Sequence, residues 1–295
     1  MLERINWREL LSERTDLEIP LDKEEISVRC PFHDDRNPSL SINFSKGLFF
    51  CHACNEGGTL KTFIIKYLED EKISSIISRY IEESLIVNFG LEENEEQKSL
   101  PEIEYPFKDT IYPIWILERD FNRKVLDKWE FGKSDSGSLS IPIRDENRRI
   151  VGWVCRQPKG RFPKYVYSKG LKTSKILFGE YNISKEADKI CITEGPLDTV
   201  WLDQHSIPSV ALFGLNLSKF QERRLSLLGI GEFILCLDND APGQRALEVI
   251  SNKLSKYGIV ARIEIPDGYK DVQDIRDPKL LKMVIKNRVL FKEKK

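Results

Sequence analysis

The pattern of apolar and polar residues divides the chain into several parts, and its clearest part begins at Lys189. From there, short apolar runs alternate with helical stretches. The apolar runs are residues 190–192, 209–212, 233–237 and 259–265, and the helices are expected to start near Pro196, Ser218 and Pro242. Apolar strands separated by helices are typical of a parallel sheet covered on both faces. We therefore expect a parallel α/β domain over residues 188–285, followed by a charged tail over residues 286–295.

A different pattern occupies the N-terminal third of the chain. Polar and apolar residues alternate over residues 39–44, as in a half-buried strand, and residues 48–50 form the returning strand after a turn. Helical patterns are seen at residues 7–11, 59–68 and 73–86. These elements predict a small module over residues 1–87.

Two further segments join these parts. Residues 88–105 are acidic and poor in apolar side chains, which predicts an exposed linker. Residues 106–187 show mixed α and β patterns and form the expected middle subdomain. The fold class is therefore α/β, in a multi-domain arrangement of the α+β type.

Composition narrows the class of protein. With 295 residues, of which 40% are hydrophobic, the chain is able to build real cores. No apolar run reaches the roughly 18 residues of a membrane span, and the first residues are too polar for a signal peptide. We expect a cytoplasmic protein with no membrane partner, in which Cys155, Cys191 and Cys236 are buried thiols.

Four residues near the N-terminus have the spacing of a zinc site. Two residues separate Cys30 from His33, two separate Cys51 from Cys54, and 17 separate the pairs. Three thiolates and an imidazole complete a tetrahedral shell with no position left for water. We expect one structural Zn²⁺ that supplies much of the folding energy of this module. His52 lies between two ligands and is expected to point away.

Carboxylates follow two strands of the predicted parallel sheet. Glu194 follows the strand at 190–192, and Asp238 and Asp240 follow the strand at 233–237. Because the carboxyl ends of parallel strands face one crevice, we expect these three side chains to meet there. Hard oxygen ligands suit Mg²⁺ or Mn²⁺. The three residues are therefore predicted to be catalytic and to bind Mg²⁺ or Mn²⁺.

Other acidic residues are ambiguous. Asp271 and Asp274 follow the next strand, and either one could add a ligand to the same site. Asp198 stands where a helix cap or a turn residue explains an aspartate equally well.

The formal net charge of −1 hides a basic segment. Residues 141–175 contain ten Lys or Arg and two acids, with aromatic residues between them, as in Arg161, Phe162, Lys164 and Tyr165. Such a pattern suits a phosphate backbone with bases stacked nearby. A solvated basic face is the alternative, but the position just before the acidic cluster favours nucleic acid.

Together the motifs resemble the DnaG-type primases of bacteria and phages. The N-terminal module is similar to their CHC2-type zinc-binding domain at residues 30–33, 37–40, 50–54 and 57–58. Glu194 and Asp198, with Asp238 and Asp240, resemble the Toprim fold of primases, topoisomerases and some nucleases. Between them, residues 141–145, 152, 156, 163–165 and 177–179 follow the order of the primase polymerase core. The resemblance extends from about residue 28 to residue 275.

This resemblance implies synthesis of short RNA primers on a single-stranded DNA template, by metal-dependent nucleotidyl transfer from nucleoside triphosphates. Asp271 would assist the metal-binding carboxylates, and the zinc module would read the template. The residues expected to contact template or triphosphates are Arg144, Arg156, Lys164 and Lys175. A replicative helicase is an expected partner.

Two alternatives stay open at this point. One is a Toprim-type metal-dependent nuclease or topoisomerase-like enzyme, and the other is a non-catalytic module that binds single-stranded DNA during replication. Within the primase interpretation, the sequence ends soon after the acidic domain, and Lys270-Asp271 followed by Asp274 looks like a phage variant of the third acidic motif. We therefore expect a primase of the phage or plasmid type.

Overall fold

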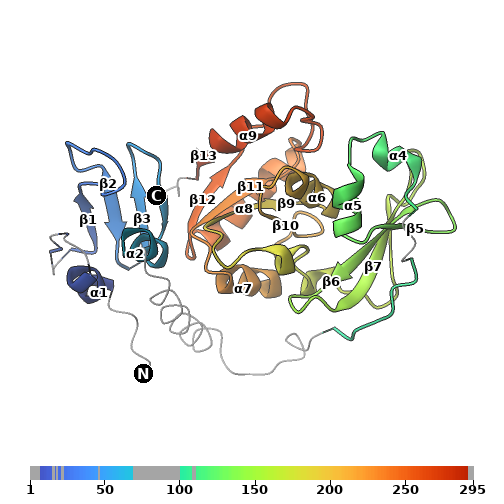
Figure 1. Ribbon diagram of the computed structural model, residues 1–295, viewed down its shortest axis with the longest axis horizontal. Helices are drawn as coiled ribbons and strands as arrows, with labels where there is room; N and C mark the ends of the chain where they lie inside the picture. The colour runs from blue at the N-terminus through green and yellow to red at the C-terminus, as the bar shows by residue number, and fades with distance from the viewer. Residues whose placement is uncertain are drawn as a thin grey trace.

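The computed structural model describes residues 7–14, 17, 19–20, 23–45, 47–68, 100–107 and 111–291. Three β-sheets occur within these ranges (Figure 1). The helix expected over residues 73–86 lies outside the described residues, as do most of the expected linker and the last four residues of the expected tail.

The N-terminal unit is a small antiparallel sheet with two helices. Its elements are α1 Trp7–Arg14, β1 Glu25–Val28, β2 Leu40–Asn43, β3 Leu48–Cys51, β4 Gly57–Thr59 and α2 Leu60–Leu68. The strands pair in the order β1-β2-β3-β4, which confirms the predicted hairpin. Its core includes Phe49 and Phe63, whose ring centroids lie 5.1 Å apart in an edge-to-face arrangement.

The middle unit is a second antiparallel sheet. Its elements are α4 Ile114–Leu117, α5 Arg123–Lys128, β5 Gly132–Lys133, β6 Leu139–Arg144, β7 Ile150–Arg156 and β8 Tyr165–Tyr167. Its strands pair in the order β5-β6-β7-β8. The end of the expected linker belongs to this unit, because Ile103 N–H donates to the Ile150 carbonyl at 2.7 Å and Tyr105 is buried. An exposed linker reaching residue 105 was therefore a wrong prediction at its C-terminal end.

The C-terminal unit contains the predicted parallel sheet. Its strands are β9 Lys189–Thr193, β10 Ser209–Ala211, β11 Glu232–Cys236, β12 Ile259–Arg262 and β13 Val289–Leu290. Its helices are α6 Pro196–Gln204, α7 Lys219–Leu227, α8 Ala241–Leu254 and α9 Pro278–Lys286. The order is β10-β9-β11-β12-β13, and only β13 runs antiparallel to its neighbour.

The expected charged tail contains this last strand. Asn287 ends α9, β13 closes the sheet edge, and Arg288 forms a bidentate ion pair with the buried Glu232. The tail prediction was therefore wrong as far as residue 291, because one salt bridge and one strand pairing hold this segment on the sheet.

The helices begin where local chemistry favours it. Ser218 and Gln221 form a capping box at the start of α7, and prolines occupy the first turns of α6, α8 and α9. Proline fits there because the first N–H groups of a helix have no intrahelical acceptor.

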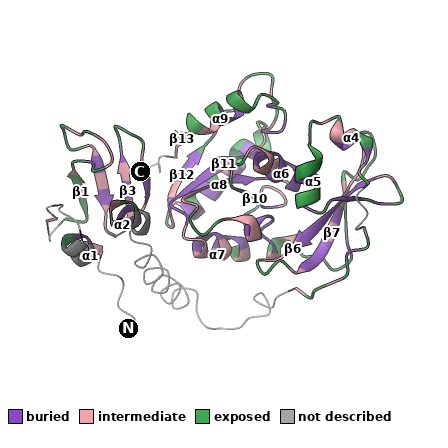
Figure 2. Cartoon of the chain, viewed as in Figure 1, coloured by how far each residue is buried: buried purple, intermediate pink, exposed green. Residues whose placement is uncertain are grey.

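The middle and C-terminal units share one core. The strands that meet in it are buried along most of their length (Figure 2). Phe178 and Ala211 also exchange backbone hydrogen bonds across the junction, at 3.1 and 3.0 Å. Cys191 and Cys236 are buried as predicted, whereas Cys155 is only half-buried.

The N-terminal unit lies against the amino ends of the parallel strands. A Cβ atom added to Gly231, which directly precedes β11, would lie 2.5 Å from the Cα atom of Gly58 in β4. Only glycine permits so close an approach of two backbones. The zinc-ligand module is thus at the opposite end of the sheet from the carboxyl ends of its strands.

Among the described residues, no helix is long and apolar enough to cross a membrane.

Candidate zinc centre and acidic cleft

The four predicted zinc ligands converge in the N-terminal unit. The ligand atoms of Cys30, His33, Cys51 and Cys54 all lie within 4.8 Å of one another. Cys30 Sγ is 3.9 Å from Cys54 Sγ, and His33 Nδ1 is 4.0 Å from Cys51 Sγ. A tetrahedron with zinc–sulfur bonds of about 2.3 Å has edges of about 3.8 Å. This donor set therefore fits one closed Zn²⁺ site.

Asp35, which the sequence analysis did not single out, organises this site. Its carboxylate accepts hydrogen bonds from the Ser39 hydroxyl at 2.6 Å and from Cys30 N–H at 2.8 Å. These bonds lower the pKa of Asp35 to about 2. Its other oxygen lies 3.7 Å from His33 Nε2. This separation is longer than a hydrogen bond, and it leaves the opposite nitrogen, Nδ1, on the side of the other ligands.

The hairpin also favours the deprotonated form of one of the thiols, that of Cys51. Burial alone would raise the pKa of Cys51, but hydrogen bonds from Cys54 N–H and from the Ser39 hydroxyl outweigh it and lower this pKa to about 7. The deprotonated thiol is the form that zinc binds. His52 is exposed and lies 3.5 Å from the Ser41 hydroxyl, outside the ligand set, as expected.

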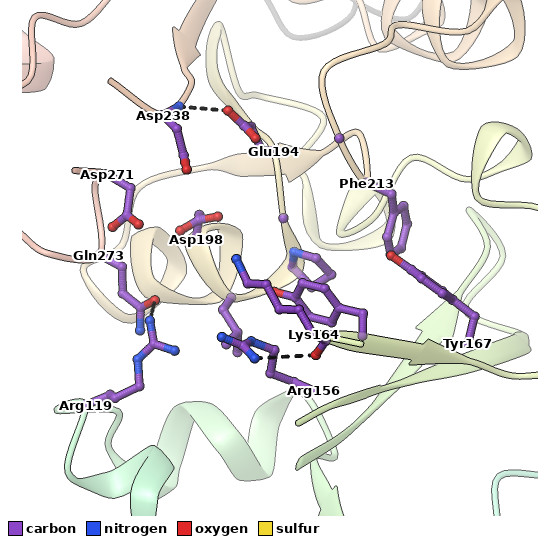
Figure 3. A pocket seen from close by; sticks show the side chains of 15 residues that line it. Arg119, Arg156, Lys164, Tyr167, Glu194, Asp198, Phe213, Asp238, Asp271 and Gln273 are labelled. Carbon is purple, nitrogen blue, oxygen red and sulfur yellow. Dashed lines mark hydrogen bonds between the residues drawn. The ribbon is translucent and has the colours of Figure 1, made fainter. Parts of the chain in front are cut away.

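A second candidate site is a cavity of about 240 Å³ between the middle and C-terminal units. Four carboxylates line one side of it (Figure 3): those of Glu194, Asp198, Asp238 and Asp271. The carboxyl ends of β9 and β11 bring Glu194 and Asp238 together as predicted, whereas Asp240, the third predicted member, is not part of the lining. Asp271 lies in the loop after β12, and Asp198 stands in the first turn of α6. Glu194 Oε1 accepts from Asp238 N–H at 2.9 Å, and Lys270 Nζ lies 2.7 Å from Asp238 Oδ2.

Burial, together with neighbouring negative charge, raises the pKa of three of these carboxylates. Burial raises the pKa of Glu194 and of Asp271. The pKa of Asp198 is raised to about 8, first by burial and then by the charges of Asp271 and Asp238. A divalent cation would relieve this repulsion, so the donor set suits Mg²⁺ or Mn²⁺.

The carboxylates do not yet form a closed metal cage. Among the residues that the structure describes, only the Cys/His set brings three or more ligand atoms together within 4.8 Å. Mg²⁺ usually keeps several waters and binds through one or two carboxylates together with substrate phosphates. The cleft is thus suited to a metal that arrives with a phosphorylated ligand.

Two of the acidic candidates are engaged in local structure. Asp240 is exposed and caps α8, where its Oδ1 accepts from Gly243 N–H at 2.8 Å. Asp274 accepts from Lys270 N–H at 3.0 Å and is also exposed. Neither belongs to the cavity lining, whereas Asp271 does. The metal-binding role of Asp240 remains a prediction.

Basic and aromatic side chains form the other side of the cleft. Arg156 ends β7 and Lys164 precedes β8, and both charges lie over the Tyr165 ring, at 5.1 and 5.6 Å from its centroid. Arg144 instead pairs with Glu130, and Lys175 lies in a short 3₁₀ helix outside the cavity lining. Of the four predicted phosphate contacts, the structure thus brings two to the acidic wall.

The cleft contains further residues that sequence reasoning missed. They are Arg119, Tyr167, Phe213 and Gln273. Arg119 follows α4 and donates to the Gln273 side chain, 154 residues further along the chain. No local pattern signals such a pair, because only the fold brings the two loops together.

Comparison with known proteins agrees with both sites. Residues 1–90 match the CHC2 zinc finger family and residues 191–276 the Toprim-like family. A DNA primase of Mycoplasma genitalium is 25% identical, covering 93% of this chain and 57% of the relative. A DNA primase of Legionella pneumophila is 27% identical, covering 80% and 50%. The chain therefore spans about half the length of the curated relatives that it matches.

A solved structure shows the same fold over nearly the whole chain. The crystal structure of the zinc-binding and RNA polymerase domains of the Aquifex aeolicus primase has a TM-score of 0.53 and 20% identity, covering 97% of this chain and 84% of that one. The DnaG primase catalytic domain bound to single-stranded DNA also has a TM-score of 0.53, at 16% identity, covering 73% of this chain and 81% of that one. The chain is a homologue of the DnaG-type primases, with a CHC2 zinc ribbon ahead of a Toprim domain.

Proposed function

We propose that the protein is a DNA primase that makes short RNA primers on single-stranded DNA from nucleoside triphosphates during replication. One observation carries the proposal: a single cleft sets four carboxylates of the Toprim domain against Arg156 and Lys164 of the middle sheet. Transfer of a nucleotide requires both a cation and positive side chains around the triphosphate.

The roles follow from the positions of the side chains. Glu194, Asp238 and Asp271, together with Asp240 from the start of α8, would hold Mg²⁺ or Mn²⁺, which would stabilise the triphosphate and acidify the attacking 3′-hydroxyl when bound. Because Glu194 accepts a hydrogen bond from the Asp238 backbone, the two loops are aligned before any ligand arrives. Arg156 and Lys164 would bind phosphate oxygens, and Tyr165 holds their charges in place.

Asp198 has a separate part in this proposal. With its pKa raised to about 8, it retains a proton near neutral pH as long as no cation is bound. It would release this proton when the metal enters, so metal binding should be tighter at higher pH.

The zinc ribbon would read a short template sequence. It lies at the amino ends of the parallel strands, opposite the acidic cleft. A template held by both sites would therefore need the ribbon to leave this contact, or the ribbon of a second molecule. Arg144 and Lys175 would contact template outside the cleft, and a replicative helicase would supply the template strand. The phage or plasmid character of the enzyme remains a prediction.

The test is primer synthesis on mixed-sequence single-stranded DNA with all four ribonucleotides and Mg²⁺ or Mn²⁺. Short oligonucleotides that require both template and metal are expected. Cleavage of the DNA without nucleotides would contradict the proposal and support the nuclease alternative. DNA binding that is indifferent to metal, with no product, would support a non-catalytic module.

A further inference from the structure

Phe162 is an apolar side chain that the fold leaves in solvent. It is 95% exposed, more than any other large apolar residue that the structure describes. It stands in the connection between β7 and β8, outside the lining of the acidic cleft. Single exposed apolar residues are common on protein surfaces, so exposure alone does not indicate a binding site. The backbone and the charges around Phe162 provide the further evidence.

The connection that carries Phe162 is braced on two sides. It is closed by a hydrogen bond from Gln157 N–H to the Lys164 carbonyl at 3.0 Å. The guanidinium of Arg161, the residue before Phe162, donates to the Ser136 carbonyl at 2.9 Å, which ties the connection to the loop between β5 and β6. A ring presented from a braced loop loses little entropy when a ligand contacts it.

Positive charge surrounds the ring along the chain. Lys159, Arg161 and Lys164 are all exposed, and no acidic residue occurs in the connection between β7 and β8. An aromatic ring among cations suits a polyanion that also carries flat apolar groups. A single-stranded nucleic acid is such a ligand, because its unpaired bases expose their faces beside the phosphates. In a duplex, neighbouring base pairs cover those faces.

Aromatic side chains continue from this connection into the cleft. The ring centroids of Tyr165 and Tyr167 lie 6.4 Å apart, and those of Tyr167 and Phe213 lie 6.5 Å apart (Figure 3). All three rings belong to the cavity lining. Phe162 precedes Tyr165 by three residues, so their Cα atoms are at most about 11 Å apart. Phe162 therefore lies close to the cleft without belonging to it.

We propose that Phe162 stacks on an unpaired base of the template strand just outside the cleft, while Lys159 and Arg161 bind the flanking phosphates. This proposal rests on the proposed function, which supplies the single-stranded template. The contact would hold the strand in place before it reaches the carboxylates. It would not select a sequence, because every base offers a π-face. Reading of sequence is left to the zinc ribbon.

The experiment measures binding of the full chain to two labelled strands of equal length by fluorescence anisotropy, over a series of salt concentrations. One strand is mixed-sequence single-stranded DNA, and the other has the same backbone with an abasic analogue at every position. Phe162→Ala should weaken binding of the base-bearing strand about tenfold, on the scale of one lost stacked base. Binding of the abasic strand and the melting temperature should not change. Phe162→Trp should retain full affinity.

Two further variants separate stacking from charge. Lys159→Ala should weaken binding of both strands and reduce the slope of log Kd against log salt by about 0.7, the value for one phosphate contact on a single strand. Phe162→Ala should leave that slope unchanged. Val249→Ala, the matched control, removes another exposed apolar side chain, from α8, and should change neither affinity nor slope.

Three results would overturn the stacking contact. The first is unchanged binding of the base-bearing strand by Phe162→Ala, and the second is equal weakening of both strands. The third is an effect of Phe162→Ala on self-association alone, seen by sedimentation, which would assign the ring to a second copy of the chain.

Primer synthesis by the wild-type chain reports on the proposed function separately. Synthesis by the wild type, together with unchanged DNA binding by Phe162→Ala, rejects the contact alone. Loss of base-dependent binding in Phe162→Ala, without any synthesis by the wild type, rejects the function alone.

Discussion

The zinc ribbon and the acidic cleft are two metal sites built on opposite plans. In the ribbon, three thiols and an imidazole lie within 4.8 Å of one another, and Asp35 holds the ligand loop through Cys30 N–H and the Ser39 hydroxyl. In the cleft, four carboxylates share one cavity without closing around a point, and burial raises the pKa of three of them: Glu194, Asp198 and Asp271. The first site is complete in the chain, and the second needs a ligand to complete it.

The two ligand sets indicate different functions for the two metals. A closed shell of protein ligands holds zinc permanently and stabilises a unit with a small core. An incomplete shell leaves positions for waters and phosphates, so the cation can enter with substrate.

Loss of a zinc ligand should unfold the ribbon and spare the rest of the chain. Zinc contributes on the order of 10 kcal/mol to such a unit, more than its small core can replace. For Cys51→Ser we expect loss of bound zinc by elemental analysis and rapid proteolysis confined to the N-terminal unit. His52→Ala is the control and should keep its zinc. A protease-resistant ribbon in Cys51→Ser without zinc would contradict the structural role of the metal.

Neutralising a cleft carboxylate should do the reverse and remove activity without harming the fold. Asp238→Asn should lower primer synthesis by about a thousandfold, the scale of a lost electrostatic catalytic group. Its melting temperature should change little, because the amide keeps the shape of the side chain. The matched variant Asp267→Asn changes an exposed carboxylate outside the cavity lining and should keep full synthesis. Normal synthesis by Asp238→Asn would remove this residue from the metal site.

Asp240 has two candidate roles, because it caps α8 and is also a predicted metal ligand. Asp240→Ala should destabilise the chain by about 1 kcal/mol through loss of the cap. Asp240→Asn keeps a capping oxygen, so its stability should be preserved while synthesis falls strongly. If Asp240→Asn retains both stability and synthesis, Asp240 is a helix cap alone.

Replacing a basic residue inside the cleft and one outside it should have different effects on nucleotide binding. Arg156→Ala removes a charge from the cleft and should raise the KM for nucleotides about tenfold in steady-state synthesis. Arg144→Ala removes a charge that is paired with Glu130 outside the cleft and should leave this KM unchanged. Equal effects of the two variants would show that the cavity does not define the nucleotide site.

A further expected effect is a dependence of stability on pH. The pKa of Asp198 is raised from 3.8 to about 8 in the folded chain, so between these values the folded state binds more protons than the unfolded one. Its contribution to the free energy of unfolding therefore falls as pH rises through this window. Relative to Asp198→Asn, the wild type should lose melting temperature from pH 6 to pH 8, and Mg²⁺ should restore more of it at pH 8. A parallel pH profile for the two proteins would contradict the raised pKa.

The sequence predicted the features that depend on short local patterns. The zinc ligands follow from two short spacings, and the strands before Glu194 and Asp238 follow from apolar runs that the parallel sheet buries. Asp198 stayed ambiguous because helix caps favour aspartate too. Only the structure shows its carboxylate beside those of Asp271 and Asp238.

What the sequence could not predict depends on contacts between distant segments. Nothing near Arg119 or Gln273 indicates that they meet, and the strand at 289–290 is too short to stand out from a charged tail. Charge counting likewise could not separate Arg156, which faces the carboxylates, from Arg144, which pairs with Glu130.

The most direct test of the contrast between the two sites is to count metals with and without nucleotide. After dialysis the chain should retain one zinc, and Mn²⁺ titration followed by electron paramagnetic resonance should show weak binding alone. Addition of ATP should tighten Mn²⁺ binding beyond its affinity for free ATP, and Asp238→Asn should abolish this gain. Tight Mn²⁺ binding without nucleotide, or no gain when ATP is added, would contradict a cleft that substrate completes.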